Sequence, residues 1–138
     1  MKILQLTNLA IGAVAVDTLL PLGTVTRRFG CGNTRQSAFA VSTANANTIT
    51  INEPGYYYIN YSASLSASGA GDVILNLLVN GETVLTKTET ASAVGFVDIT
   101  VPYIVRVLPC VPVTIQVEND EGSVAITTGT SNVTVTKL

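Results

Sequence analysis

The chain has 138 residues; 47% are hydrophobic, 12% are charged, and the formal net charge is −2. This length fits one domain with a proper core, and no apolar run reaches the roughly 18 residues of a membrane-spanning helix. Basic residues do not cluster beyond Arg27–Arg28, so the charge pattern gives no indication of a nucleic-acid partner. We therefore expect neither nucleic acid nor membrane as a partner, and the apolar excess must enter a core or a subunit interface.

The first 45 residues contain short apolar stretches that could be either strands or a signal peptide. Met1–Lys2 is a minimal basic start and Ala13–Ala15 has the small side chains of a cleavage site. Polar residues interrupt the apolar stretch, which favours an ordinary first strand and synthesis without secretion. The strands expected here are Ile3–Leu6, Gly12–Val16, Thr24–Phe29 and Ala38–Val41.

From residue 48 onward, polar and apolar residues alternate with a period of two, and turn residues recur every 8–12 positions. Asn80–Gly81 after an apolar run predicts a β-hairpin, and no segment has a helical period. The expected strands are Thr48–Ile51, Gly55–Ser64, Asp72–Val79, Glu82–Lys87, one or two within Ser92–Leu108, Val113–Glu118, Ser123–Thr128 and Ser131–Leu138. The pattern predicts an all-β protein built as a two-sheet sandwich or jelly roll.

The segment EPGYYYINYSAS, residues 53–64, places bulky side chains on both faces of one strand. Tyr57, Ile59 and Tyr61 share one face, whereas Tyr56, Tyr58 and Asn60 share the other. Residues 73–79 and 101–108 are also apolar on both faces, the latter interrupted by Arg106. Such strands are hard to solvate in a monomer, so we favour a subunit interface over cover by loops or by residues 1–45. Arg106 either forms a salt bridge across that interface or extends its head to water.

Catalytic residue types are sparse. The chain has no histidine, which excludes Ser–His–Asp and Cys–His catalysis. Most of its nine acidic residues are scattered, so a paired-carboxylate glycosidase remains possible only in principle. Glu118, Asp120 and Glu121 do cluster, and this cluster fits a solvated turn better than a Ca²⁺ site. Cys31 and Cys110 are too few for a disulfide framework, and two buried free thiols are favoured. We expect no enzyme activity, no metal and no cofactor.

Four segments together resemble a known family: ITINEPGYYYINYSASL, GDVILNLLVNG, VDITVPYIVRVLPCVPVTIQVEN and SNVTVTKL. They are similar to the jelly-roll domain shared by tumour necrosis factor and the globular heads of complement. The nearest resemblance is to bacterial and phage members, including the C-terminal domain of collagen-like spore-surface glycoproteins. It covers residues 46–138, with residues 1–45 as additional strands and a candidate docking segment. One departure is Pro109–Pro112, where the family usually has Gly-Asp.

The resemblance implies a homotrimer with a threefold axis beside the tyrosine strand. Residues carried over to the axis are Tyr56, Tyr58, Asn60, Thr114, Gln116 and Asn132. Residues carried over to the core are Tyr57, Ile59, Tyr61, Val113, Ile115, Val117, Val133 and Val135. The second face of the tyrosine strand would then be covered by two further copies of the chain.

The favoured function is a non-enzymatic trimeric surface protein, most simply a phage or prophage virion component such as a head decoration or fibre-head protein that docks on a capsid. The expected location is the virion, after synthesis in the host cytoplasm. The alternative is a carbohydrate- or receptor-binding module that uses loops 66–71, 88–93 and 118–122, with Ser66, Ser68, Asp120 and Glu121 as candidate ligand residues. A bacterial cell- or spore-surface protein is a further alternative, although the collagen-like stalk of such proteins is missing from this sequence.

Overall fold

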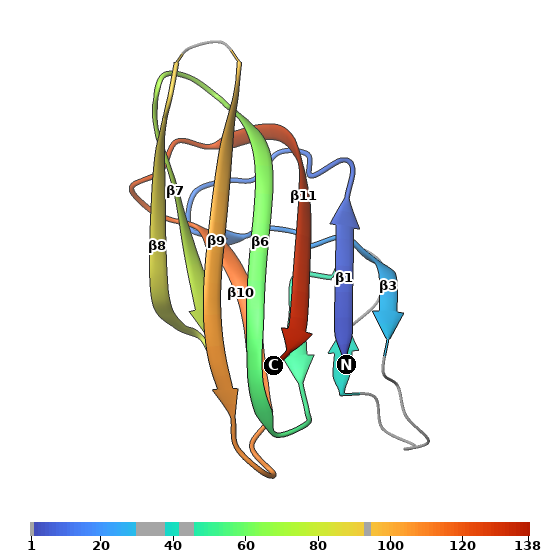
Figure 1. The fold of residues 1–138 in the computed structure, drawn as a ribbon. Helices are drawn as coiled ribbons and strands as arrows, with labels where there is room; N and C mark the ends of the chain where they lie inside the picture. The colour runs from blue at the N-terminus through green and yellow to red at the C-terminus, as the bar shows by residue number, and fades with distance from the viewer. Residues whose placement is uncertain (1, 30–37, 42–45, 93–94) are drawn as a thin grey trace.

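The computed structural model describes residues 2–29, 38–41, 46–92 and 95–138. The regular elements in these ranges are eleven strands, β1 to β11, which form two antiparallel sheets. Figure 1 shows β9, β6, β11, β1 and β3 side by side, with β7 and β10 behind them. In the described ranges, no helix is long and apolar enough to cross a membrane. The two antiparallel sheets confirm the predicted all-β sandwich.

The two sheets have distinct strand orders. The five-stranded sheet runs in the order β3 (Thr24–Phe29), β1 (Ile3–Asn8), β11 (Ile126–Lys137), β6 (Gly55–Ala67), β9 (Phe96–Val107). The six-stranded sheet runs in the order β4 (Phe39–Val41), β5 (Ile49–Ile51), β10 (Val113–Asn119), β7 (Gly71–Val79), β8 (Glu82–Ala91), and β2 (Thr18–Leu19) pairs with β10. Consecutive strands along the chain often lie in different sheets, so the core forms between them.

The core follows the alternation of the sequence. Each predicted core residue of the C-terminal two thirds of the chain is buried: Tyr57, Ile59, Tyr61, Val113, Ile115, Val117, Val133 and Val135. Tyr57 meets Phe39 edge to face, with ring centroids 5.8 Å apart, and its hydroxyl donates a hydrogen bond of 2.9 Å to the Glu53 carbonyl. Aromatic pairs of this geometry add to the stability that burial provides, which anchors β6 to the opposite sheet.

Residues 2–29 are part of the sandwich. Leu4, Leu6, Leu20 and Leu22 are completely buried, and β1 lies between β11 and β3. The predicted strand Gly12–Val16 is wrong, because only Val14 pairs, in a single bridge to Ile126. Gly12 has a φ of 75°, a backbone conformation that ends an extended strand.

Several strand limits differ from the sequence expectation. The sequence predicts two strands near the C-terminus, whereas the structure has one, β11. A shift in the β6–β11 pairing register between Ile126 and Thr128 lets this strand continue through the irregular part of the sequence. β6 continues to Ala67 and β8 to Ala91. The Asn80–Gly81 hairpin is confirmed, with φ values of 52° and 82° that fit a type I′ turn.

Cys110 lies at the turn between β9 and β10. Its thiol is free and exposed, so the prediction of a buried thiol is wrong for this residue. Its φ of 61° places it at the tip of the turn, where the side chain points to solvent. Cys31 lies outside the described residues.

Candidate functional site: the outer face of the five-stranded sheet

The outer face of the five-stranded sheet has an apolar half. The register aligns one row of side chains across all five strands: Phe29, Ile3, Thr136, Tyr58 and Ile104. Next to this row, Tyr56 lies opposite Arg106. Phe29 is 56% exposed, Ile104 55%, Tyr56 53% and Tyr58 38%. Large side chains this exposed on adjacent strands form an apolar patch, which marks an interaction surface.

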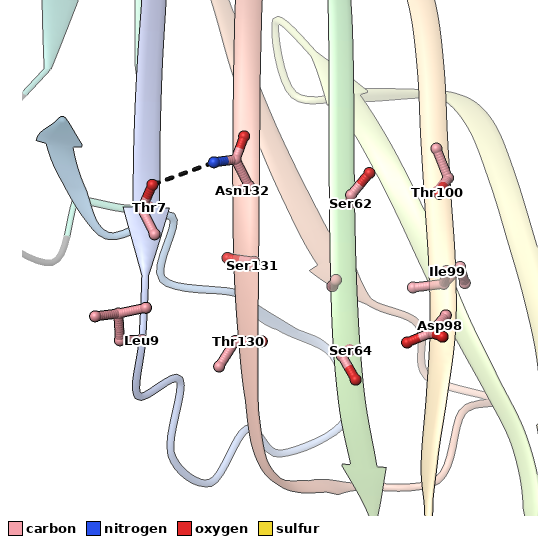
Figure 2. A pocket seen from close by; sticks show the side chains of 11 residues that line it. Thr7, Leu9, Ser62, Ser64, Asp98, Ile99, Thr100, Thr130, Ser131 and Asn132 are labelled. Atoms are coloured by element: carbon pink, nitrogen blue, oxygen red, sulfur yellow. Dashed lines mark hydrogen bonds between the residues drawn. The ribbon is translucent and has the colours of Figure 1, made fainter. Parts of the chain in front are cut away.

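The other half of the same face is lined with hydroxyl groups. One row consists of Thr24, Thr7, Asn132, Ser62 and Thr100, and the next of Thr130, Ser64 and Asp98. Except for Thr24, these side chains lie around a hollow in Figure 2, where the Asn132 amide donates a hydrogen bond of 3.2 Å to the Thr7 hydroxyl. The hollow has a volume of about 390 Å³, and Leu9 stands at its edge. The face thus changes from aromatic to hydroxylic along the strands.

The hollow is lined mainly by polar groups that form hydrogen bonds. Among the residues that line it, Asp98 is the single ionisable group. Hydroxyl and amide groups in this density hold water or a polyhydroxylated ligand by hydrogen bonds. In the part of the chain that the structure describes, no three His, Cys, Asp or Glu side chains gather as metal ligands do.

The structure brings together four of the six residues expected at the threefold axis. Tyr56, Tyr58 and Asn60 lie on β6, and Asn132 on β11 faces the same side in the neighbouring strand. Thr114 and Gln116 do not join them, because β10 belongs to the six-stranded sheet and their side chains point away from the core on its far side. Gln116 donates a hydrogen bond of 2.8 Å to the Thr48 hydroxyl there.

Sequence reasoning missed three apolar members of this face. Ile104 lies opposite Tyr58 across β6 and β9, while Ile3 and Phe29 extend the row toward the edge of the sheet. The alternation of residues 101–107 placed Ile104 and Arg106 on one side of their strand. The sequence could not show that this side adjoins Tyr56 and Tyr58, since that depends on the β6–β9 pairing.

Arg106 is held over an aromatic ring. Its guanidinium carbon lies 5.8 Å from the centroid of the Tyr56 ring, and Arg27 has the same relation to Phe29 at 5.9 Å. A guanidinium over a ring gains cation–π attraction while its edges stay hydrated. Two arginines therefore flank the apolar rows, one on β9 and one on β3.

The acidic cluster of the 119–123 turn has an internal structural role. The Asn76 amide donates hydrogen bonds to Asp120, at 2.8 Å, and to Glu118, at 3.2 Å. The bond from Asn76 to Asp120, with a second from the Gly122 amide, lowers the pKa of Asp120. The Ser123 hydroxyl accepts a hydrogen bond of 3.0 Å from the backbone of Ile74. On the outer side of β7, Asn76 and Leu78 are therefore buried within the single chain.

The candidate ligand residues lie at the end of the sandwich that contains this turn. Ser66 lies near the end of β6, and Ser68 comes directly after the strand. The Ser68 amide donates a hydrogen bond of 2.8 Å to the Ala125 carbonyl. The 66–71 and 119–125 segments are therefore neighbours. Asp120 is occupied by the hydrogen bonds described above, whereas Glu121 is exposed. A ligand role for these four residues stays a prediction.

No known sequence family and no curated protein matches the chain. Solved structures do match over nearly the whole length. The globular domain of zebrafish complement 1qA protein has a TM-score of 0.72 at 11% identity, with 100% of this chain and 98% of that chain covered. Murine APRIL has a TM-score of 0.63 at 12% identity, with 99% and 98% covered.

A viral protein has the same architecture. The PRD1 vertex protein P5 has a TM-score of 0.59 at 16% identity, with 99% of this chain and 96% of that chain covered. At these identities the likeness shows the fold alone. The chain is a two-sheet antiparallel jelly roll of the tumour necrosis factor and complement-head type.

Proposed function

We propose that this protein is a non-enzymatic homotrimer that decorates the surface of a larger particle, specifically a phage or prophage virion. Three copies pack the apolar half of the five-stranded sheet around a threefold axis. Tyr56, Tyr58 and Ile104 form the centre of each contact, with Asn60 and Asn132 beside them. The expected location is the virion, with a bacterial cell or spore surface as the alternative.

The exposed apolar rows support this proposal most directly. The row from Phe29 to Ile104 runs across all five strands, and both of these side chains are more than half exposed. Interface cores are rich in aromatic and aliphatic residues and poor in charge, and this composition fits the rows between the two arginines. A closed cyclic trimer buries the patch on every copy, whereas an isolated chain leaves it in water.

The structural likenesses add support of a second kind. The solved neighbours include the globular domain of zebrafish complement 1qA protein and murine APRIL. Another neighbour is the vertex protein P5 of PRD1, which supports a place on the surface of a particle.

Two measurements test the proposal. Light scattering of the purified protein at low micromolar concentration should give a mass near three times 14.4 kDa. Immunogold labelling of particles pelleted from cells that produce the protein should place it on the particle surface. A mass near 14.4 kDa refutes the trimer. A trimer that stays in the supernatant refutes the decoration of particles.

A second function, carbohydrate binding, is favoured by the hydroxyl-lined hollow. Its walls offer the serine, threonine, amide and carboxylate groups that bond sugar hydroxyls, with Leu9 and Ile99 as apolar neighbours. A glycan array repeated with and without Ca²⁺ tests this function. Binding that is lost in Ser62→Ala and unaffected in Thr50→Ala would support the hollow as the site; an array without hits would contradict it.

A further inference from the structure

Charge is distributed unevenly along the sandwich. We define the basal end as the end with both chain termini and the β9–β10 turn, which lie together in Figure 1. The Lys137 amide donates a hydrogen bond of 2.9 Å to the Lys2 carbonyl, and the Leu138 amide bonds the Tyr56 carbonyl. Five of the six described lysines and arginines lie at this end or in the rows beside it: Lys2, Arg27, Arg28, Arg106 and Lys137.

Acidic residues gather in the opposite half, which we call the distal half. Seven of the nine carboxylates lie there: Asp17, Asp72, Glu89, Asp98, Glu118, Asp120 and Glu121. The basal end has two, Glu53 and Glu82. Glu53 accepts an ion pair of 2.6 Å from Lys2 and another of 3.7 Å from Lys137, so one carboxylate is shared between two ammonium groups. The basal end therefore has an excess of positive charge in a protein whose net charge is negative.

The two ends act as separate charged surfaces. β6 runs from the basal end to the distal half over 13 residues, which is a length of about 40 Å at roughly 3.3 Å per residue. The Debye length at physiological ionic strength is about 8 Å. The acidic half is therefore screened from the basal end, and a partner at the basal end experiences mainly the local positive field.

The basal end also presents an apolar tip. The β9–β10 turn exposes Leu108 by 46% and Val111 by 51%. Pro109 follows Leu108 and Pro112 follows Val111, and both prolines restrict the backbone. A hydrogen bond of 3.2 Å from the Val111 amide to the Leu108 carbonyl closes the turn. A rigid apolar tip beside lysines and arginines has the apolar centre and charged rim of a protein–protein interface.

We propose that the basal end docks on an acidic protein surface, with the acidic half directed away from it. This inference rests on the proposed trimer, which would gather three basal ends into one positive ring. Charge steers the approach, and the apolar tips supply contact area. A lipid surface fits less well, because the β9–β10 turn exposes no tryptophan or tyrosine of the kind that anchors proteins at a membrane interface. Nucleic acid fits less well, because the exposed side chains of Leu108 and Val111 offer a phosphate backbone no polar contact.

Binding to immobilised poly-L-glutamate tests the inference, with phosphatidylglycerol vesicles and duplex DNA as competing probes. At about 0.1 M salt, where the Debye length is about 10 Å, the wild-type protein should bind poly-L-glutamate, and Lys137→Gln should weaken this binding roughly fivefold. Lys87→Gln is the matched control, because Lys87 is exposed in the middle of β8 and also loses one charge. Arg27→Gln is a second basal variant that leaves the ion pairs of Glu53 intact.

Three results would overturn the inference. The first is that the wild type does not bind poly-L-glutamate, and the second is that Lys87→Gln weakens this binding as much as Lys137→Gln does. The third is that the protein binds the vesicles or DNA more strongly than it binds poly-L-glutamate. Solution mass is measured on every variant, so failure of the trimer is seen separately. A monomer whose binding still depends on Lys137 and not on Lys87 would refute the trimer and support basal docking.

Discussion

Replacing Ile104 by aspartate should dissociate the trimer. Ile104 is 55% exposed in the single chain, and burying a whole isoleucine side chain is worth about 1.5–3 kcal/mol. Burying the exposed part of Ile104 in the trimer contact therefore contributes about 1 kcal/mol per copy, and the substitution removes this contribution from all three copies. An aspartate in the same place would also put an unpaired carboxylate into the contact, which costs several kcal/mol more. At low micromolar concentration the Ile104→Asp mass should fall from near three times 14.4 kDa to near 14.4 kDa.

The control for this experiment is Val84→Asp. Val84 is 37% exposed on β8, in the other sheet, so its carboxylate stays in water and the mass should remain that of the wild type. Circular dichroism of both variants checks that each is folded. The reasoning fails if Ile104→Asp keeps the wild-type mass, or if Val84→Asp dissociates to the same extent.

Four further substitutions, one of them a control, probe the stability of the fold. The hydrogen bond from Lys2 lowers the pKa of the Glu53 carboxyl below 4.5. The stability that the ionised carboxylate contributes is therefore present above pH 4.5 and is lost as the pH falls through the folded-state pKa. The difference in unfolding free energy between wild type and Glu53→Gln should therefore disappear on acidification. Gly129→Ala places a Cβ 2.5 Å from a carbonyl oxygen of β6 and should cost about 2 kcal/mol, whereas Gly69→Ala, with open space around it, should stay within about 0.5 kcal/mol in denaturant unfolding. Asn76→Ala should cost about 2–3 kcal/mol and raise the pKa of Asp120 toward 3.8 in an NMR titration.

The sequence predicted the strands where local pattern is sufficient. Thr24–Phe29 has the predicted limits, and Asn80–Gly81 makes the predicted hairpin. Alternation within the tyrosine strand correctly divided Tyr57 and Tyr61 from Tyr56 and Tyr58, because successive side chains of a strand point to opposite faces regardless of the fold. Limits were less accurate where a strand continues past serine, threonine and glycine, as β11 does.

The face that we propose as the interface needed the tertiary structure. Alternation assigns a side chain to one of two faces of its own strand, but it does not tell which sheet the strand joins. The family resemblance placed Thr114 with Tyr58, although β10 lies in the other sheet. Nor does alternation tell whether an outward face is covered. β7 and β6 are both apolar on two sides, yet Leu78 on β7 is buried while Tyr56 and Tyr58 on β6 stay exposed. Sequence determines local periodicity and turns; strand pairing across long separations decides which side chains become neighbours, because it depends on the packing of the whole chain.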